Sequence, residues 1–310
     1  MSKIILAFGE ILWDLLPSGR TLGGAPFNFA YRACCLNDRG IIVSRLGRDE
    51  LGLAARDRVV ALGMETTFLQ WDQQYPTGTV QVGFDADSNP DYYIVPDVAY
   101  DHAGVTDDLL ELAGEADCLC FGTLAQRRPV ARDSCRQLLE AADAAIKLLD
   151  LNLRKDCYSI DTISSSLEQA NILKLNEQEA IQLADMLSMP GYKLEDFVKE
   201  LISGQGLSCC VVTLDRRGAF ATSSDGEEVY VPGYKVELAD SLGAGDAFTA
   251  GFIHKYLARA SLGECCEYGN AMGAVVASQE GGTVPLGESD VLELLESRGD
   301  RVFDPDKLPG

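Results

Sequence analysis

Short apolar runs alternate with longer amphipathic stretches from about residue 115 onward. Short apolar runs are typical of strands buried on both faces, whereas apolar positions that recur every three or four residues are typical of helices. The strand-like runs lie at 117–121, 147–151, 172–175 and 209–214. The helix-like stretches lie at 129–147, 177–187, 194–203, 246–260, 264–279 and 289–297. This alternation predicts a mostly parallel sheet with helices on both faces.

Two segments depart from the alternation. The runs 218–222 and 228–231 are separated by Ser-Ser-Asp-Gly, which predicts an antiparallel hairpin at one edge of the sheet. Residues 66–100 are rich in Thr, Gln, Asp, Tyr and Pro and carry strand patterns without a helix between them. Together with residues 11–22, this segment predicts a small β-sheet lid inserted in a single α/β domain that spans residues 1–310. A surface hairpin without a role is the alternative.

Composition narrows the class of protein. The chain has 310 residues, 46% of them apolar, which is enough for a large core. Its formal charge of -22 predicts that it repels nucleic acids and anionic membrane surfaces. The apolar run at the N-terminus is too short for a signal sequence, and no run reaches the ~20 residues of a membrane span, so we expect a cytoplasmic protein. The ten cysteines lie mostly in apolar runs and are expected to be reduced core thiols.

The most informative stretch is Asp-Ser-Leu-Gly-Ala-Gly-Asp at 240–246, which precedes a predicted helix. Gly243 and Gly245 permit a sharp turn and let a phosphate approach the main chain. With Ala244 between them, their N–H groups can converge on negative charge at the helix N-terminus. Asp246 is then placed to accept a proton from an attacking hydroxyl. An ordinary helix start with a capping carboxylate is the alternative interpretation.

The same stretch resembles the C-terminal signature of the ribokinase-like (PfkB) carbohydrate kinases, with Ser241 where Thr is usual. The resemblance covers nearly the whole chain. Gly-Glu-Ile-Leu-Trp-Asp at 9–14 is similar to the first strand of the family, and Gly-Gly-Ala-Pro-Phe-Asn at 23–28 is similar to its N-terminal signature. The resemblance implies a three-layer α/β/α sandwich with a small β-sheet lid, and an active site between them where ATP phosphorylates a sugar.

The resemblance also assigns roles to individual residues. The residues expected to bind the sugar are Asp14, Gly23, Gly24, Asn28, Arg154 and the lid residue Tyr93. Those expected to border the nucleotide are Asn176, Thr213, Gly218 and Asn270, with Asp215 where the family usually has Gly. Glu179 would act on Mg²⁺ through water, while Asp240 and carbonyls of the loop 280–283 would bind a monovalent cation. A requirement for K⁺ is left open.

Within the family, the two opening motifs look most like those of fructokinases, so we expect D-fructose to be converted to fructose 6-phosphate. A 2-keto-3-deoxygluconate kinase is the close alternative, because Arg154, Tyr92 and Tyr93 could recognise a carboxylate. Another sugar or nucleoside kinase of the family is a further alternative, and Asp14 disfavours a phosphosugar.

Two other classes of protein are less favoured by the sequence. A nicotinamide-dependent oxidoreductase should carry Gly-x-Gly-x-x-Gly after the first strand, and the chain lacks it there. A noncatalytic sugar sensor would be expected to have lost Asp246 or the glycines before it. No nucleic-acid or membrane partner is expected, whereas an exposed lid edge would favour a homodimer.

Overall fold

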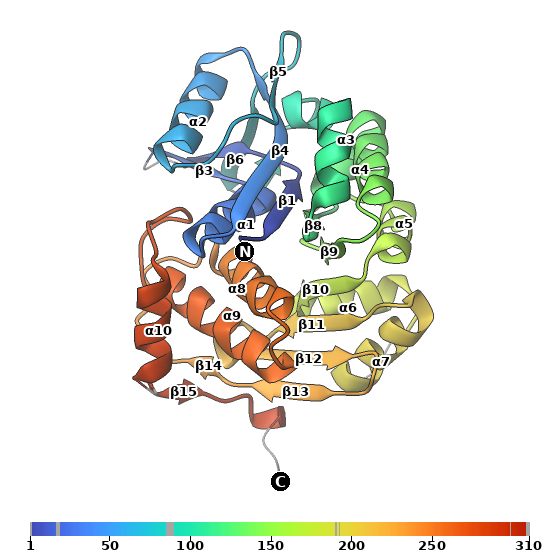
Figure 1. The fold of residues 1–310 in the computed structure, drawn as a ribbon, viewed down its shortest axis with the longest axis vertical. Coiled ribbons are helices and arrows are strands. Elements are labelled where there is room, and N and C mark those ends of the chain that lie inside the picture. The colour runs from blue at the N-terminus through green and yellow to red at the C-terminus, as the bar shows by residue number, and fades with distance from the viewer. Residues whose placement is uncertain are drawn as a thin grey trace.

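A large sheet forms the centre of the protein (Figure 1). The computed structural model describes residues 2–16, 19–84, 90–189, 191, 193–297 and 299–307. The order of the strands across the sheet is β13-β12-β11-β10-β9-β8-β1-β4-β5. Their bounds are β1 Ile4–Phe8, β4 Arg39–Gly47, β5 Leu69–Asp72, β8 Cys118–Phe121, β9 Ile146–Asp150, β10 Ile172–Asn176, β11 Cys209–Thr213, β12 Ala219–Ser223 and β13 Glu228–Val231. All neighbours are parallel except β11–β12 and β12–β13, which form the expected antiparallel edge.

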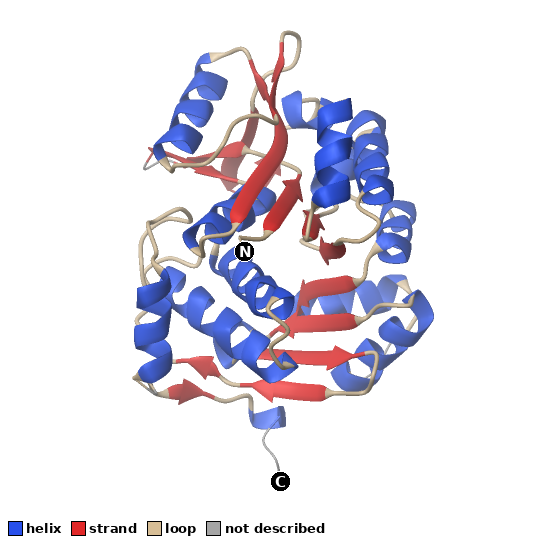
Figure 2. Ribbon diagram, viewed as in Figure 1, coloured by secondary structure: helices blue, strands red, loops and turns tan. Residues whose placement is uncertain are grey.

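Helices cover both faces of this sheet (Figure 2). One face carries α1 Ala25–Cys35, α2 Glu50–Ala61, α8 Ala244–Leu257 and α9 Leu262–Ala277, with α10 Glu288–Glu296 packed on α9. The other face carries α3 Asp107–Glu115, α4 Pro129–Ala141, α5 Ile160–Gln169, α6 Glu177–Met186 and α7 Leu194–Gln205. Alternate residues of β1 enter opposite cores, since Leu6 and Phe8 face one helix layer and Ile5 and Ala7 face the other. The expected three-layer α/β/α sandwich is therefore confirmed.

A second, four-stranded sheet stands off the first, with the order β3-β2-β6-β7. Its strands are β2 Leu12–Leu16, β3 Gly19–Gly23, β6 Gly78–Phe84 and β7 Pro90–Ile94. Residues 66–100 are expected to belong to this small sheet, but β5, which lies within that range, pairs with β4 and extends the main sheet. Leu69 is buried and Trp71 packs against the core that α2 covers, so burial draws this strand to the large sheet.

Helix α4 ends at Ala141, six residues before the end of the stretch 129–147 that the pattern predicts to be helical. The chain then turns, and β9 begins at Ile146. Ala142 and Ala145 in the turn are buried in the same core as the helix. Apolar periodicity therefore continues through the turn and does not mark where the helix stops.

The remaining short elements are the strand pair β14 Gly233–Tyr234 and β15 Arg301–Val302, and the 3₁₀ turns η1 Ala99–His102, η2 Leu124–Arg127, η3 Asp215–Arg217 and η4 Pro305–Lys307. All ten cysteines lie in the described part of the chain; none forms a disulfide, and eight are buried. None of the helices that the structure describes is long and apolar enough to cross a lipid bilayer.

Candidate active site

The glycine-rich turn opens helix α8. Gly243 caps the helix with a φ of 76°, in the left-handed region that glycine adopts without strain. A Cβ atom at Gly243 would lie 3.0 Å from the Cα of Gly282, so the neighbouring loop leaves little room for a side chain. The first N–H groups of a helix have no partner within it and carry partial positive charge. The turn 243–245 therefore has the backbone geometry of an anion-binding site.

Asp246 lies in the first turn of α8 and meets a residue from the other end of the chain. Asn28, on α1, donates a hydrogen bond from Nδ2 to Oδ2 of Asp246 at 2.8 Å. The two helices pack side by side near the centre of the molecule (Figure 1). Burial and the nearby charge of Asp150 raise the pKa of Asp246 to about 6, although the Asn28 hydrogen bond opposes the shift. A carboxylate with such a pKa is a stronger base than an ordinary aspartate and is still ionised at neutral pH.

The other amide atom of Asn28 points to a ligand. Its Oδ1 is buried and has no hydrogen-bond partner among the described residues. Buried acceptors are nearly always paired, because an unpaired one costs about 1–3 kcal/mol. Since Nδ2 is engaged with a carboxylate, Oδ1 is left to accept a hydrogen bond from a hydroxyl bound next to Asp246.

Four of the residues expected to bind the sugar lie beside one another or beside this pair, namely Asp14, Gly23, Gly24 and Arg154. Asp14 on β2 lies against β3, where a Cβ at Gly23 would come within 3.0 Å of its Oδ2. Gly24 has a φ of 117°, and a Cβ there would lie 2.3 Å from the carbonyl oxygen of Glu10. Burial raises the pKa of Asp14, and the charge of Arg154 opposes that shift. The charge of Arg154 also works to lower the pKa of Asp246, so Arg154 lies close to both carboxylates.

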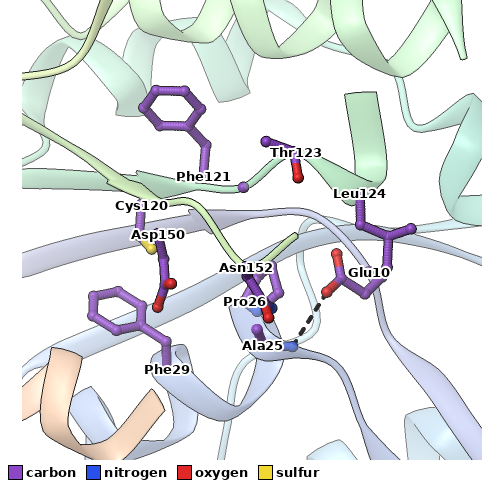
Figure 3. A pocket seen from close by; sticks show the side chains of 11 residues that line it. Glu10, Ala25, Pro26, Phe29, Cys120, Phe121, Thr123, Leu124, Asp150 and Asn152 are labelled. Atoms are coloured by element: carbon purple, nitrogen blue, oxygen red, sulfur yellow. Dashed lines mark hydrogen bonds between the residues drawn. The ribbon is translucent and has the colours of Figure 1, made fainter. Parts of the chain in front are cut away.

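Glu10 is a buried carboxyl group that the sequence motifs did not single out. It lines a small cavity with Asp150 and Asn152, and its Oε1 accepts a hydrogen bond from the N–H of Ala25 at 3.3 Å (Figure 3). Burial raises the pKa of Glu10 to about 7. The carboxyl group therefore supports the start of α1, three residues before Asn28. An acidic residue two positions after the first strand was the signal available in the sequence.

Lys174 is the second residue that the motifs missed. It is buried on β10, and its Nζ lies 3.1 and 3.2 Å from the two carboxylate oxygens of Asp150. Thr249, on α8, donates to the same carboxylate at 3.2 Å. A Cβ at Gly245 would lie 3.6 Å from the Lys174 Nζ, so this ammonium group lies next to the glycine-rich turn. A single lysine inside an apolar strand was the signal in the sequence.

Asn176 and Glu179 form a reciprocal cap at the start of α6. Asn176 Oδ1 accepts from the Glu179 N–H at 2.9 Å, and Glu179 Oε2 accepts from the Asn176 N–H at 2.8 Å. The other Glu179 oxygen accepts from the N–H of Leu153. Burial raises the pKa of Glu179, while the charge of Lys174 opposes the shift. With both oxygens engaged, this carboxylate fits a hydrated Mg²⁺ held through water rather than a directly bound ion.

The expected nucleotide side is formed by the ends of β11 and β12. Thr213 ends β11, and Gly218 begins the return with a φ of 99°, where a Cβ would lie 2.0 Å from the carbonyl oxygen of Val231. Asn270 is buried, and its Nδ2 donates to Val231 O at 3.0 Å, so its amide ties α9 to β13. Its contact with an adenine ring therefore remains only a prediction from resemblance.

The expected lid residues are less well connected to the site. The side chain of Tyr93 on β7 is 57% exposed, and no hydrogen bond joins it to the other expected site residues in the described part of the chain. The side chain of Tyr92 lies outside what the structure describes. The structure thus brings Asp14, Asn28, Arg154 and Asp246 together, and it leaves the side chain of Tyr93 exposed.

The structure accounts for aspartate at position 215, where the resemblance expects glycine. Asp215 has a φ of 56°, in the left-handed region. Aspartate tolerates this region far better than a β-branched residue does. We expect Asp215→Gly to change the free energy of unfolding by less than about 1 kcal/mol and Asp215→Val to lower it by about 1–3 kcal/mol. Urea unfolding measures both, and equal stability of the two variants would contradict this account of the turn.

Comparison with known proteins adds to this geometry. The sequence profile described as pfkB family carbohydrate kinase matches residues 18–288. Among curated proteins, fructokinase-1 of Oryza sativa subsp. japonica is 28% identical over 327 residues, which cover 96% of this chain and 98% of the relative. Aminoimidazole riboside kinase of Salmonella typhimurium is 26% identical over 320 residues and covers 96% of each chain.

A solved structure shares the fold. A double mutant of fructokinase from Vibrio cholerae, in its fructose, ADP and potassium ion bound form, superposes with a TM-score of 0.80 at 21% identity. The match covers 95% of this chain and 98% of the other.

Proposed function

Because the chain belongs to the pfkB family of carbohydrate kinases, we propose that it transfers the γ-phosphoryl group of ATP to a primary hydroxyl of a free sugar, D-fructose. The observation that carries this proposal is the Asn28–Asp246 pair at the N-terminus of α8. It provides a base, an unpaired acceptor for a hydroxyl and a backbone turn for phosphate oxygens within one small region.

In the proposed reaction, Asp246 accepts the proton of the sugar hydroxyl as the hydroxyl oxygen attacks the γ-phosphorus. The new O–P bond forms while the bond between the γ-phosphorus and the bridging oxygen breaks, and ADP leaves with that oxygen. The N–H groups of the turn 243–245 and the Lys174 ammonium stabilise charge on the phosphoryl oxygens. Mg²⁺, when bound, would offset the charge of the nucleotide phosphates, with Glu179 reaching it through water.

Fructose is favoured by the likeness of the opening motifs to fructokinases and by the similarity to rice fructokinase-1. Asp14 offers a carboxylate to sugar hydroxyls, and its like charge disfavours a phosphosugar. A 2-keto-3-deoxygluconate kinase is the second candidate, since Arg154 lies beside the site and could pair with a substrate carboxylate. The riboside kinase relative gives a reason to test ribosides as well.

The experiment is ADP release with ATP and Mg²⁺ against D-fructose, 2-keto-3-deoxygluconate, ribose, adenosine and fructose 6-phosphate. Turnover on fructose with the highest kcat/KM supports the full proposal. Preference for the ketoacid or a riboside would replace the substrate and keep the reaction. Turnover of fructose 6-phosphate alone would overturn the claim of a free-sugar acceptor.

The small sheet is proposed to act as a lid. It carries Asp14 on β2, and the loop that bears Glu10 at the edge of the cavity leads into β2. Closure over the sugar would keep water away from the γ-phosphoryl group. The outer strands β3 and β7 leave edges at which a second copy of the chain could pair.

The activity should have an acidic limb set by Asp246. A base with a pKa of about 6 is protonated below that pH, so kcat/KM should fall about tenfold per pH unit below about pH 6 and stay level above it. A pH–rate profile measures this. Glu10→Gln is the control, because it removes the carboxyl with a pKa of about 7 and should leave the limb in place. A limb that disappears in Glu10→Gln would assign the titration to Glu10 instead.

A further inference from the structure

Arg32 is a fully buried arginine that the proposed reaction does not use. It lies on α1, four residues and so one turn after Asn28. No ion pair joins it to a carboxylate among the described residues. Its hydrogen bonds go to two backbone carbonyls, since Nη1 donates to Val284 O at 2.7 Å and Nη2 donates to Gly282 O at 2.8 Å, and the guanidinium lies 5.2 Å from the centre of the Tyr31 ring. A buried arginine is normally paired with an acid, so a guanidinium held by carbonyls calls for an explanation.

The loop that Arg32 holds borders the reacting groups. A Cβ at Gly243 would lie 3.0 Å from the Cα of Gly282, so the loop touches the anion-binding turn. A Cβ at Gly282 would lie 3.6 Å from Nδ2 of Asn28, which donates to Asp246. The position of this loop therefore affects both the turn that would hold phosphate and the pair that would hold the hydroxyl.

The same loop was expected to bind a monovalent cation with Asp240. In the structure, Oδ1 of Asp240 accepts from the N–H of Leu242 at 3.0 Å, and Oδ2 accepts from the N–H of Gly281 at 3.1 Å. The carbonyl oxygen of Gly282 is engaged by Arg32. A second positive charge in the loop would lie near the guanidinium, which repels it. The groups present therefore do not fit a potassium ion well, because the chain's own donors occupy them.

We propose that the Arg32 guanidinium is a built-in monovalent cation that holds the loop 281–284 against the anion-binding turn, so that phosphoryl transfer by this protein needs no potassium. Arg32 is then a positioning residue: it orders the carbonyls of the loop, and the loop orders Gly243 and Asn28. The inference rests on the proposed function only in that its kinetic readout uses phosphoryl transfer.

The test compares wild type, Arg32→Met and Arg32→Lys in buffer free of alkali metal ions, with tetramethylammonium chloride replaced stepwise by KCl at constant ionic strength. ADP release with the best sugar of the panel gives kcat, and thermal unfolding gives Tm. Arg39→Met is the matched control, because it removes an arginine with an exposed side chain that pairs with Glu65. Methionine keeps the length of the side chain and removes its charge, whereas lysine keeps the charge.

For wild type and Arg39→Met, kcat should change less than about twofold as KCl rises, and Tm should change by less than about 1 °C. Arg32→Met should lose about 10–100-fold in kcat without potassium and regain at least about fivefold with it, since the freed carbonyls can then bind the ion. Its Tm should rise with KCl and not with tetramethylammonium. Arg32→Lys should lose less activity and respond little to potassium, because its ammonium group keeps the charge.

Wild type activated more than about tenfold by potassium would overturn the proposal. So would Arg32→Met with full activity in the absence of potassium, or with a loss that no cation restores in either kcat or Tm. If Arg32→Met does not fold, the wild-type titration and Arg32→Lys decide alone. If no sugar of the panel is turned over, the proposed function fails, while the Tm titration still decides the role of Arg32.

Discussion

Asp246→Asn is expected to lower kcat by about 10²–10⁴-fold while ATP affinity stays within about threefold of wild type. The asparagine oxygen can still accept the hydrogen bond from Asn28, so the shape of the site is kept and only the base is lost. Single-turnover ADP release and nucleotide titration measure the two quantities. Asp133→Asn is the matched control. Asp133 lies on the exposed surface of α4, so this variant should be as active as wild type. A variant with more than about a tenth of wild-type turnover would rule out Asp246 as the base.

The same substitution should make the protein more stable at neutral pH. The pKa of Asp246 is raised by burial and Asp150 to about 6, above the value of 3.8 for a free aspartate. A raised carboxyl pKa means that the folded state prefers the protonated form, so stability is full below about pH 4 and declines as pH rises through about 6. An asparagine does not ionise and avoids that loss. We expect a gain of about 1–3 kcal/mol in the free energy of unfolding at pH 7.5, with little gain at pH 4.

Lys174→Met is expected to lower the free energy of unfolding by about 3–5 kcal/mol, because it leaves buried acids without their cation. Burial works to lower the pKa of Lys174, yet the charges of Asp150, Glu179 and Asp246 outweigh it and raise the pKa. The lysine is therefore charged in the folded protein. Urea unfolding measures the loss, and Lys199→Met, which removes an exposed lysine paired with Glu228, should unfold at nearly the same urea concentration as wild type.

Two further measurements separate charge from packing at Lys174. Adding Asp150→Asn to Lys174→Met should recover about 1–3 kcal/mol, because the pair at 3.1 Å is then removed from both sides. The acidic limb of kcat/KM should also move to higher pH in Lys174→Met, since the lysine lowers the pKa of Asp246 in wild type. Equal stability of Lys174→Met and Lys199→Met would show that the buried cation is not needed to offset the acids.

Local patterns in the sequence determine part of this fold, and contacts between distant segments determine the rest. The strands β8 to β13 and the helices α6 to α9 follow from apolar periodicity, because burial on one or both faces imposes that periodicity on neighbouring residues. The turn 243–245 was also readable, since its glycines meet a local need for left-handed backbone and close approach. The end of α4 was not, because buried alanines continue past it.

Which residues contact each other across the site could not be predicted from local sequence patterns. Asn28 and Asp246 are 218 residues apart, and only the packing of α1 on α8 brings them together. In the sequence, Lys174 is a single polar residue in an apolar strand, and Arg32 is a single arginine in a helix. Only the folded structure places Asp150 of β9 beside Lys174 and the loop 281–284 beside Arg32. Local backbone preferences determine which residues follow one another along the chain, so the sequence alone predicted the fold class and the glycine-rich turn before Asp246. Which charges neutralise one another depends on contacts between distant segments, and those exist only once the helices have packed on the sheet.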